Sequence, residues 1–314
     1  MSFLTRAGFA LVAVFLSVGA TGALAQGCSD AGVCTAPGLS SGHTENEFRN
    51  FVSFEPTFGV GEEGTSVFSP SVVVGLALGK STQVQLKVPY FVTSGDLGGA
   101  SGIGDITVSA VRHLWNSGKM SMDATLGLRL PTGKTDLTDE IGGNDFVLPM
   151  VYQTGLGTLD LLAGVSMRYE KWLFAVGYQQ PLSQDNKNTF LASGSETLSL
   201  PDDKAKQAKE YFSSKDLERA PDVVLRAERA FDIKSSSLSV GLLSVFHMGK
   251  DKVAGQDVDD SQGVTLNLSA SWEYPVSDRV TVGVNAGTPL AVRKERPAGL
   301  TRGFVISPAV RIKF

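Results

Sequence analysis

Hydrophobic and polar residues alternate one by one through the last stretch of the chain, residues 301–314. Ile306 and Val310 fall on one face of an extended chain, and Ser307 and Arg311 fall on the other. Successive side chains of a β-strand point to opposite faces, so this pattern predicts a strand with one apolar and one polar face. The same alternation recurs along most of the chain and restricts the protein to folds built from long strands.

Twelve segments show this alternation, and each exceeds the roughly 9–11 residues that cross a membrane as a tilted strand. Tight turns and mostly longer polar connections alternate between them, as in barrels with short periplasmic turns and longer extracellular loops. We therefore expect an all-β fold, a transmembrane antiparallel up-and-down β-barrel of about 12 strands. The expected strands are 47–60, 65–79, 82–94, 103–115, 120–131, 157–169, 171–182, 221–232, 237–249, 262–275, 279–292 and 301–314.

A secreted β-sandwich is the alternative fold whose strands would also show alternating apolar and polar residues. Its strands are usually about 5–6 residues long and their outer faces are polar, which does not fit these segments. Trp172, Tyr178, Trp272 and Tyr274 lie near the ends of expected strands, where membrane barrels carry interfacial aromatic residues. The sequence therefore favours the barrel.

Three connections have features of their own. The glycine-rich segment 95–102 predicts a loop between two strands. The apolar piece 146–152 predicts an extension of a strand beyond the bilayer. The segment 202–219, within the longest connection, is charged and rich in helix-forming residues, so it predicts a surface helix in one loop.

Residues 1–25 have the features of a cleaved secretory signal peptide. Arg6 supplies the positive charge, residues 9–18 the short apolar core, and residues 23–25, Ala-Leu-Ala, the small-residue cleavage site. A retained membrane helix is the alternative, but the apolar run is short for a span. We expect export to the outer membrane of a Gram-negative bacterium.

Both cysteines follow the expected cleavage site, in the periplasmic segment 26–46 that precedes the barrel domain, 47–314. In an exported chain, Cys28 and Cys34 suggest a small disulfide-closed loop. A lipid-anchored Cys28 is a weaker alternative, because residues 25–27 lack the apolar residue expected three positions before a lipobox cysteine. A metal site is weaker still, because two thiols do not complete a tetrahedral shell.

The charge balance argues against nucleic acid as a partner. Removal of residues 1–25 leaves 314 − 25 = 289 residues with 28 − 1 = 27 basic and 32 acidic side chains, a mildly acidic protein. The expected partners are outer-membrane lipid, the barrel-assembly machinery and an unidentified small solute. Phe314, the last residue, resembles the terminal aromatic residue that serves as an assembly signal in bacterial outer-membrane barrels.

The polar faces of the strands predict a lumen lined by small residues and by charges of both signs. Barrel diameter grows with strand number, and eight strands are just filled by side chains, so twelve leave room for a narrow passage. The alternative is that the charged side chains interlock and close the lumen. The charged lumen candidates are Lys87, Asp105, Asp123, Arg129, Asp160, Arg168, Arg226, Glu228, Glu273, Arg279 and Arg311.

Candidates for catalysis are few, and the sequence predicts no enzyme, cofactor or metal. None of the three histidines, His43, His113 and His247, begins the His-x-Ser arrangement of outer-membrane lipases. His113 and His247 are expected to be wall residues. Asp105 and Asp123 could form an acid–base dyad, but ion pairing of these carboxylates with a lumen arginine such as Arg129 is the simpler interpretation.

Three motifs carry a family resemblance: GIGDITVSAVRHL (102–114), LGLRLPTGKTD (126–136) and GLGTLDLLAG (155–164). Through them the chain resembles the meta-pathway phenol-degradation outer-membrane proteins, relatives of the long-chain fatty-acid transporter superfamily. The resemblance covers about 100–182 well and the strand pattern to residue 314 more loosely. It implies an outer-membrane barrel that admits small hydrophobic or aromatic molecules.

The sequence thus predicts a channel or facilitator for passive uptake of small solutes. The alternative is a non-conducting structural or ligand-binding barrel that acts through its extracellular loops. The family's binding residues are not carried over, and no counterpart of the fatty-acid transporters' plug is recognised in the sequence.

Overall fold

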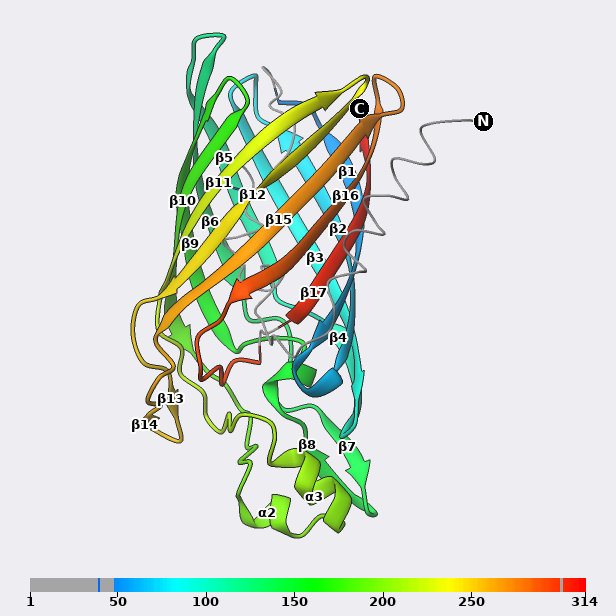
Figure 1. Ribbon diagram of the computed structural model, residues 1–314, viewed down its shortest axis with the longest axis vertical. Coiled ribbons are helices and arrows are strands. Elements are labelled where there is room, and N and C mark those ends of the chain that lie inside the picture. Colours follow the sequence, from blue (N-terminus) through cyan, green and yellow to red (C-terminus); the bar gives the residue numbers. More distant parts are fainter. Residues whose placement is uncertain (1–38, 40–47, 300–301) are drawn as a thin grey trace.

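Twelve long strands form one antiparallel sheet that closes on itself as a barrel (Figure 1). The computed structural model describes Leu39, residues 48–299 and residues 302–314. The wall strands are β1 (Phe51–Gly61), β2 (Ser66–Ala77), β3 (Thr82–Gly95), β5 (Ile106–Asn116), β6 (Met120–Leu130), β9 (Thr158–Tyr169), β10 (Trp172–Gln184), β11 (Asp222–Ile233), β12 (Ser236–His247), β15 (Gly263–Pro275), β16 (Val280–Ala291) and β17 (Arg302–Lys313).

The seam of the barrel joins its first and last strands. β1 pairs antiparallel with β17, beginning with Phe51 opposite Lys313, and β2 pairs with both β1 and β3. The Phe314 N–H donates to the Asn50 carbonyl oxygen at 3.0 Å and extends this seam. No wall strand is left with a free edge, as hydrocarbon requires, because unpaired backbone groups there are costly. The prediction of a closed twelve-stranded barrel is confirmed.

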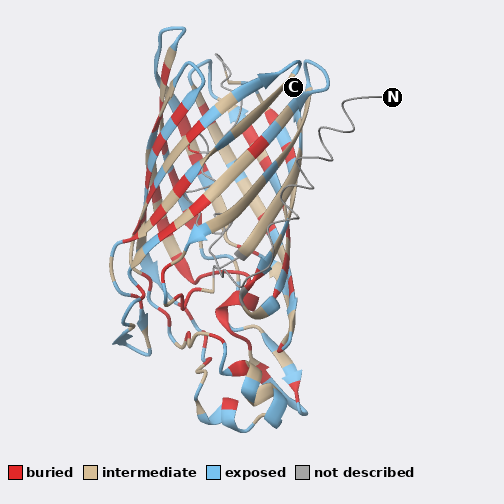
Figure 2. Ribbon diagram, viewed as in Figure 1, coloured by how far each residue is buried: buried red, intermediate tan, exposed pale blue. Residues whose placement is uncertain are grey.

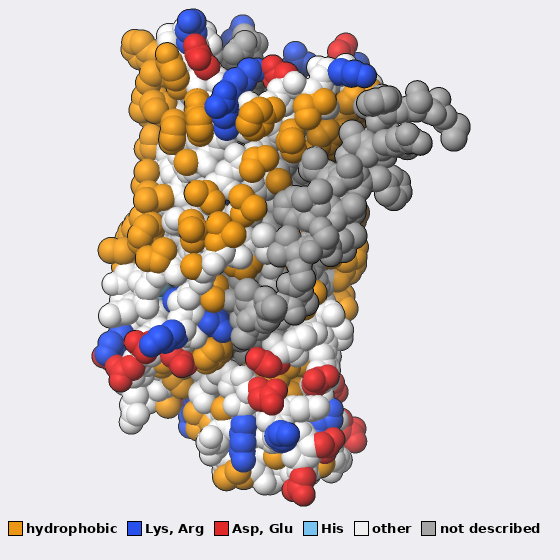
Figure 3. Space-filling view, viewed as in Figure 1, with side chains coloured by type: hydrophobic (Ala, Val, Ile, Leu, Met, Phe, Trp, Pro, Cys, Tyr) orange, Lys and Arg blue, Asp and Glu red, His pale blue; other side chains and the backbone are white. Residues whose placement is uncertain are grey.

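The outer face of the wall is apolar at mid-height. Along the strands, buried and exposed residues alternate (Figure 2), and the exposed set includes the outward-facing Leu76 and Leu126. Hydrophobic side chains cover much of the visible outer surface between the two ends, where Lys, Arg, Asp and Glu gather (Figure 3). This belt is the surface that a barrel presents to lipid.

None of the helices in the described residues has the length and apolar character needed to span a membrane.

One expected loop is a strand, so the prediction for 95–102 is wrong. β4 (Gly98–Ile103) pairs with β3 and lengthens that hairpin beyond the start of β5. Gly98 has a φ of +136°, a conformation that side-chain-bearing residues rarely adopt, and the Gly99 N–H donates to Asp139 Oδ2 at 2.8 Å. Backbone pairing and this long-range bond hold a segment whose local propensity for strand is low.

The long loops form a folded layer at one end of the barrel, shown at the bottom of Figure 1. By the loop-length rule that places short turns in the periplasm, this is the extracellular end. Its elements are the 3₁₀ turns η2 (Glu62–Gly64) and η3 (Met150–Tyr152), the hairpin β7 (Thr138–Ile141) and β8 (Asn144–Val147), the helices α2 (Ser195–Leu198) and α3 (Asp202–Ala208), and the short pair β13 (Lys252–Val253) and β14 (Gln256–Asp257).

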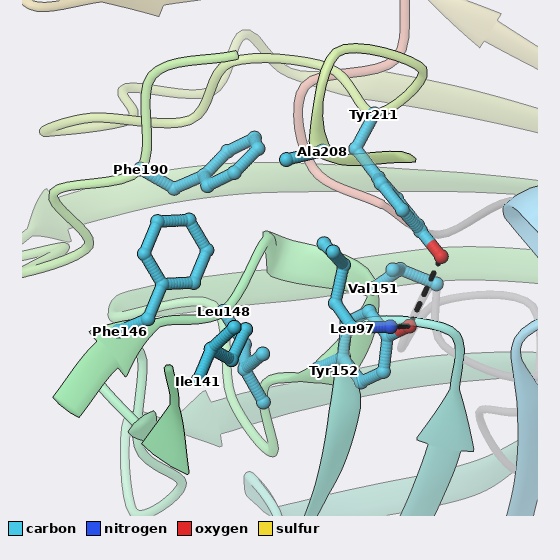
Figure 4. Packing of buried hydrophobic residues seen from close by; sticks show 9 residues of the cluster. All are labelled: Leu97, Ile141, Phe146, Leu148, Val151, Tyr152, Phe190, Ala208 and Tyr211. Atoms are coloured by element: carbon cyan, nitrogen blue, oxygen red, sulfur yellow. Dashed lines mark hydrogen bonds between the residues drawn. The ribbon is translucent and has the colours of Figure 1, made fainter. Parts of the chain in front are cut away.

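Several of these loops are held together by a hydrophobic cluster formed from their own side chains (Figure 4). The Tyr152 hydroxyl lies 3.0 Å from the Tyr211 hydroxyl and accepts the Leu97 N–H at 3.3 Å, so three separate connections meet there. The cluster comprises Leu97, Ile141, Phe146, Leu148, Val151, Tyr152, Phe190, Ala208 and Tyr211.

Two sequence expectations about these loops need correction. The helix expected over 202–219 is only α3, because the N–H groups of Ser214 and Asp216 donate to the carbonyls of Phe190 and Asn188 at 2.9 and 2.8 Å. These long-range bonds replace further helical bonds. The apolar piece 146–152 does not extend a wall strand. It ends the β7–β8 hairpin, continues into η3 and supplies side chains to the loop cluster.

Candidate functional site in the barrel lumen

A buried ion pair lies in the lumen wall toward the extracellular end. Arg129 on β6 is the direct cross-strand partner of Asp160 on β9, and its guanidinium donates to the Asp160 carboxylate. The same guanidinium lies 3.4 Å from the Thr158 hydroxyl, and Gln179 Nε2 on β10 donates to Asp160 at 2.7 Å. Because both charges are shielded from water, their pairing is geometrically specific and costly to break.

Asp105 connects this ion pair to the loops. It lies between β4 and β5 rather than on a strand, 4.0 Å from Arg129, and its two carboxylate oxygens accept the N–H groups of Gly133 and Leu156, each at 3.0 Å. A Cβ on Gly133 would lie 2.5 Å from the Thr154 carbonyl oxygen, so this loop position has room only for glycine. Asp105 therefore anchors extracellular loops to the wall.

A second buried cluster surrounds His247 at the last residue of β12. Its Nδ1 lies 2.6 Å from Asp222, its cross-strand partner, and its Nε2 lies 2.7 Å from Asp251 in the following loop. The imidazole ring thus bridges two carboxylates, one at each ring nitrogen. Arg219 donates to Asp222 at 3.0 Å, and Arg293 lies 3.6 Å from Asp251, so cations and anions alternate through the cluster.

Part of the His247 cluster could have been found from the sequence. The short turn at residues 234–236, between the expected strands 221–232 and 237–249, places Asp222 opposite His247 once the hairpin register is drawn. The contributions of Asp251 and Arg293 follow no local pattern, because they come from connections that fold back over the rim. Arg219, expected in a surface helix, is buried here instead.

We expect the Asp251 contacts to be kept in mild acid and lost in stronger acid. Burial raises the pKa of Asp251, but the hydrogen bond from His247 and the positive charges of His247, Arg293 and Arg219 outweigh it, so the pKa lies below its ordinary 3.8. A carboxyl group with a lowered folded-state pKa stabilises above the unfolded value and loses that contribution as pH falls through the folded one.

Hydrogen exchange of amides 252–261 between about pH 3 and pH 6 tests this. The amides should stay protected at pH 4 and lose protection only below it. Asp251→Ala should remove the protection at every pH, whereas Asp259→Ala, at an exposed ion pair with Lys250 in the same loop, should not. Protection of the wild type that is already lost well above pH 4 would contradict the assignment.

Toward the periplasmic end, Asp123 pairs with groups other than Asp105 or Arg129. It lies 2.5 Å from His113 Nδ1 and accepts from Arg168 at 3.1 Å. The alternative of a dyad of Asp105 and Asp123 is therefore not formed, and of the two carboxylates Asp105 lies near Arg129, as favoured, whereas Asp123 does not. The His113 ring stacks on Phe48 with the ring centres 4.0 Å apart.

The remaining lumen candidates are dispersed. Lys87 lies 3.9 Å from Glu55 and Arg311 lies 4.6 Å above the ring of Phe51. Glu273 is half-buried near the periplasmic end of β15.

Arg226 and Glu228 form an ion pair of 2.8 Å on β11. Arg279 is exposed in the turn before β16, so it is not among the strand residues of the lumen wall.

An apolar patch interrupts the polar lumen on the wall made by β9 to β12. Leu39, which precedes the first strand, packs inside the barrel against it, and a Cβ built on inward-facing Gly164 would lie 2.6 Å from Leu39. The patch consists of Leu162, Ala175, Val224, Leu243 and Val245. Its inner surface is buried, whereas inward-facing Asn285 on β16 is exposed. The lumen is therefore bounded by one apolar, covered wall and one accessible wall.

The small residues on β16 and β17 leave that second wall open. A Cβ added to inward-facing Gly287 would meet only one atom within 4 Å, a backbone oxygen at 3.8 Å. Ser307, opposite Asn285, bonds the Thr57 hydroxyl at 2.8 Å. Short side chains along this wall leave space beside the apolar patch.

The described residues contain no arrangement typical of acyl transfer or of a metal centre. Among them, neither His113 nor His247 hydrogen-bonds a serine hydroxyl, and no group of three or more His, Cys, Asp or Glu residues could hold a metal ion. Residues 1–25, His43 and the Cys28 and Cys34 pair lie outside the described residues.

A closed antiparallel barrel with an apolar outer belt and a charged lumen defines the class of outer-membrane β-barrels. The structure is similar to that of an outer membrane channel from Pseudomonas putida F1 (17% identity, 87% of this chain and 100% of that chain covered, TM-score 0.55). It is also similar to the NanC porin (6% identity, 84% and 100% covered, TM-score 0.50). Both likenesses concern the fold.

The family described as "Putative MetA-pathway of phenol degradation" matches residues 40–171 of the chain. This match includes all three motifs noted in the sequence, so the resemblance to that family is confirmed. No curated protein sequence matches the chain.

Proposed function

We propose that this protein is a passive channel or facilitator for small solutes in the outer membrane of a Gram-negative bacterium. A cleaved signal peptide would direct its export to that membrane. The observation that carries the proposal is the two-sided lumen. One wall presents the apolar patch on β9 to β12, and the other presents short, accessible side chains on β16 and β17.

The solute class that fits these walls is small and at least partly apolar. Water and polar solutes can pass along the wall of short side chains at little cost in free energy. An apolar solute that displaces Leu39 gains by leaving water against Leu162, Val224 and Leu243. The Arg129–Asp160 and His247–Asp222 pairs lie toward the extracellular rim, so they order the mouth without filling the accessible wall. The resemblance to a family associated with phenol degradation supports hydrophobic or aromatic molecules as the class.

Conductance and liposome-swelling measurements test the proposed channel directly. Purified protein in planar bilayers should give discrete single-channel steps, and proteoliposomes should swell in solutes below a size limit. Asn285→Trp, which introduces a bulky side chain on the accessible wall, should lower the unit conductance severalfold. Leu126→Trp, on the lipid-facing side of β6, is the matched control and should leave it unchanged. A barrel that neither conducts nor passes solute under any condition would remove the proposal.

A second function, a ligand-binding or structural barrel acting through its extracellular loops, is favoured by the loop cluster. Tyr152, Tyr211 and their apolar neighbours order three connections into one rigid layer, which a channel alone does not need. We propose no enzymatic activity, since neither described histidine contacts a nucleophile. The proposed partners are outer-membrane lipid and the assembly machinery that would read Phe314.

A further inference from the structure

Asn267 carries a polar group that the fold leaves without a partner. It lies on β15 and faces the lumen, and only 4% of it is exposed. Neither its amide nitrogen nor its amide oxygen has a hydrogen-bond partner. A buried amide without partners costs free energy, and an apolar side chain of the same shape would avoid that cost. Its environment therefore points to a hydrogen-bonding group supplied from outside the chain.

The neighbours of Asn267 indicate which kind of molecule could carry this external hydrogen-bonding group. Its direct cross-strand partner is Leu243, a member of the apolar patch that also includes Val224 and Leu162. Paired residues on one face of a sheet have Cβ atoms about 5 Å apart. Leu39 already packs on this patch, so the wall accepts an aliphatic group of several carbons.

A carboxylate reaches the same place from β11. Glu228 crosses over Gly241, where a Cβ would lie 2.4 Å from Glu228 Cγ, and its Oε1 accepts the Ser269 hydroxyl at 3.2 Å. Ser269 is two residues from Asn267 on the same face of β15. Glu228 Oε1 is also held by Arg226, while its buried Oε2 has no hydrogen-bond partner. A carboxylate oxygen without a partner therefore lies next to Ser269, the neighbour of Asn267 on the same face of β15.

We propose that Asn267 and Glu228 bind the hydroxyl end of a neutral amphipathic solute whose apolar body replaces Leu39 on the patch of Leu162, Val224 and Leu243. This proposal rests on the proposed function and names its substrate class. A hydroxyl both donates and accepts, so Glu228 Oε2 accepts its proton and the Asn267 amide donates to its oxygen. A purely apolar molecule would leave both groups unsatisfied.

Equilibrium binding to the full-length protein in lipid nanodiscs tests the site without requiring transport. The probes are benzyl alcohol and toluene, which differ by one hydroxyl, and binding to empty nanodiscs is subtracted. Asn267→Leu and Asn267→Ala should weaken benzyl alcohol binding by roughly threefold to tenfold, the worth of one hydrogen bond, and leave toluene binding unchanged. Heat-modifiable electrophoretic mobility verifies that each variant is folded.

Two further variants complete the design. Asn285→Leu removes an inward-facing amide from the neighbouring strand and should alter neither affinity. Leu39→Ala frees space on the patch and should tighten both probes by the same factor.

Equal losses for toluene and benzyl alcohol in the Asn267 variants, or no loss for either, would overturn the site. Conductance is measured on the same preparations. Asn267-dependent binding in a barrel that never conducts would support the site and reject the channel. Conductance in a barrel whose binding does not depend on Asn267 would support the channel and reject the site.

Discussion

Arg129→Met is expected to lower the free energy of unfolding by about 3–5 kcal/mol, because it leaves a carboxylate buried without its cation. Asp160 is fully buried and Arg129 nearly so. The remaining donor to Asp160, Gln179, is neutral and cannot compensate its charge. Urea unfolding of the barrel refolded in lipid vesicles measures the loss.

Two comparison variants separate this effect from a general loss of charge. Lys171→Met breaks the ion pair with Asp232 in a turn, where the side chains are 54% and 62% exposed, and should cost less than about 1 kcal/mol. Adding Asp160→Asn to Arg129→Met removes the uncompensated charge and should restore at least about 1 kcal/mol. Similar losses for Arg129→Met and Lys171→Met would show that the lumen pair is effectively solvated.

Leu126→Arg is expected to destabilise the barrel in a membrane by about 2–4 kcal/mol, since it places a cation at mid-depth on the lipid side of β6. Leu126 is 60% exposed and lies in the apolar outer belt. In a soluble protein such an exposed leucine would tolerate arginine at little cost. The measurement is again equilibrium unfolding from lipid vesicles.

Leu78→Arg is the matched control, because Leu78 is 62% exposed but lies in the β2–β3 turn at the end of the barrel. There the cation reaches water, and the expected cost is about 0–1 kcal/mol. The two substitutions differ only in depth. Equal costs at the two positions would mean that the outer belt does not face hydrocarbon.

The wall of the barrel was predictable because its information is local. In a strand that separates lipid from lumen, apolar and polar residues must alternate, so the sequence of each of the twelve wall strands shows which residues face lipid. Strand bounds were therefore close to those observed. The short turn at residues 234–236 sets the register of its hairpin and places Asp222 opposite His247. The register that places Asp160 opposite Arg129 spans the long connection between β6 and β9, so no turn fixes it in the sequence.

The loops were less predictable because other parts of the chain decide their conformation. Residues 209–219 contain good helix formers, yet bonds from Ser214 and Asp216 to residues 188–190 end the helix at Ala208. The glycine-rich segment 98–103 lacks strand propensity, but pairing with β3 makes it a strand.

By itself, the sequence determined which side chains face lipid and which face the lumen, because that choice is made within each strand. Only the tertiary structure decided which lumen residues act together. Asp251 and Arg293 join His247 across separate connections, Leu39 reaches the apolar patch from before the first strand, and Glu228 reaches β15 over Gly241. Such contacts depend on closure of the barrel, which brings together side chains that no local period relates.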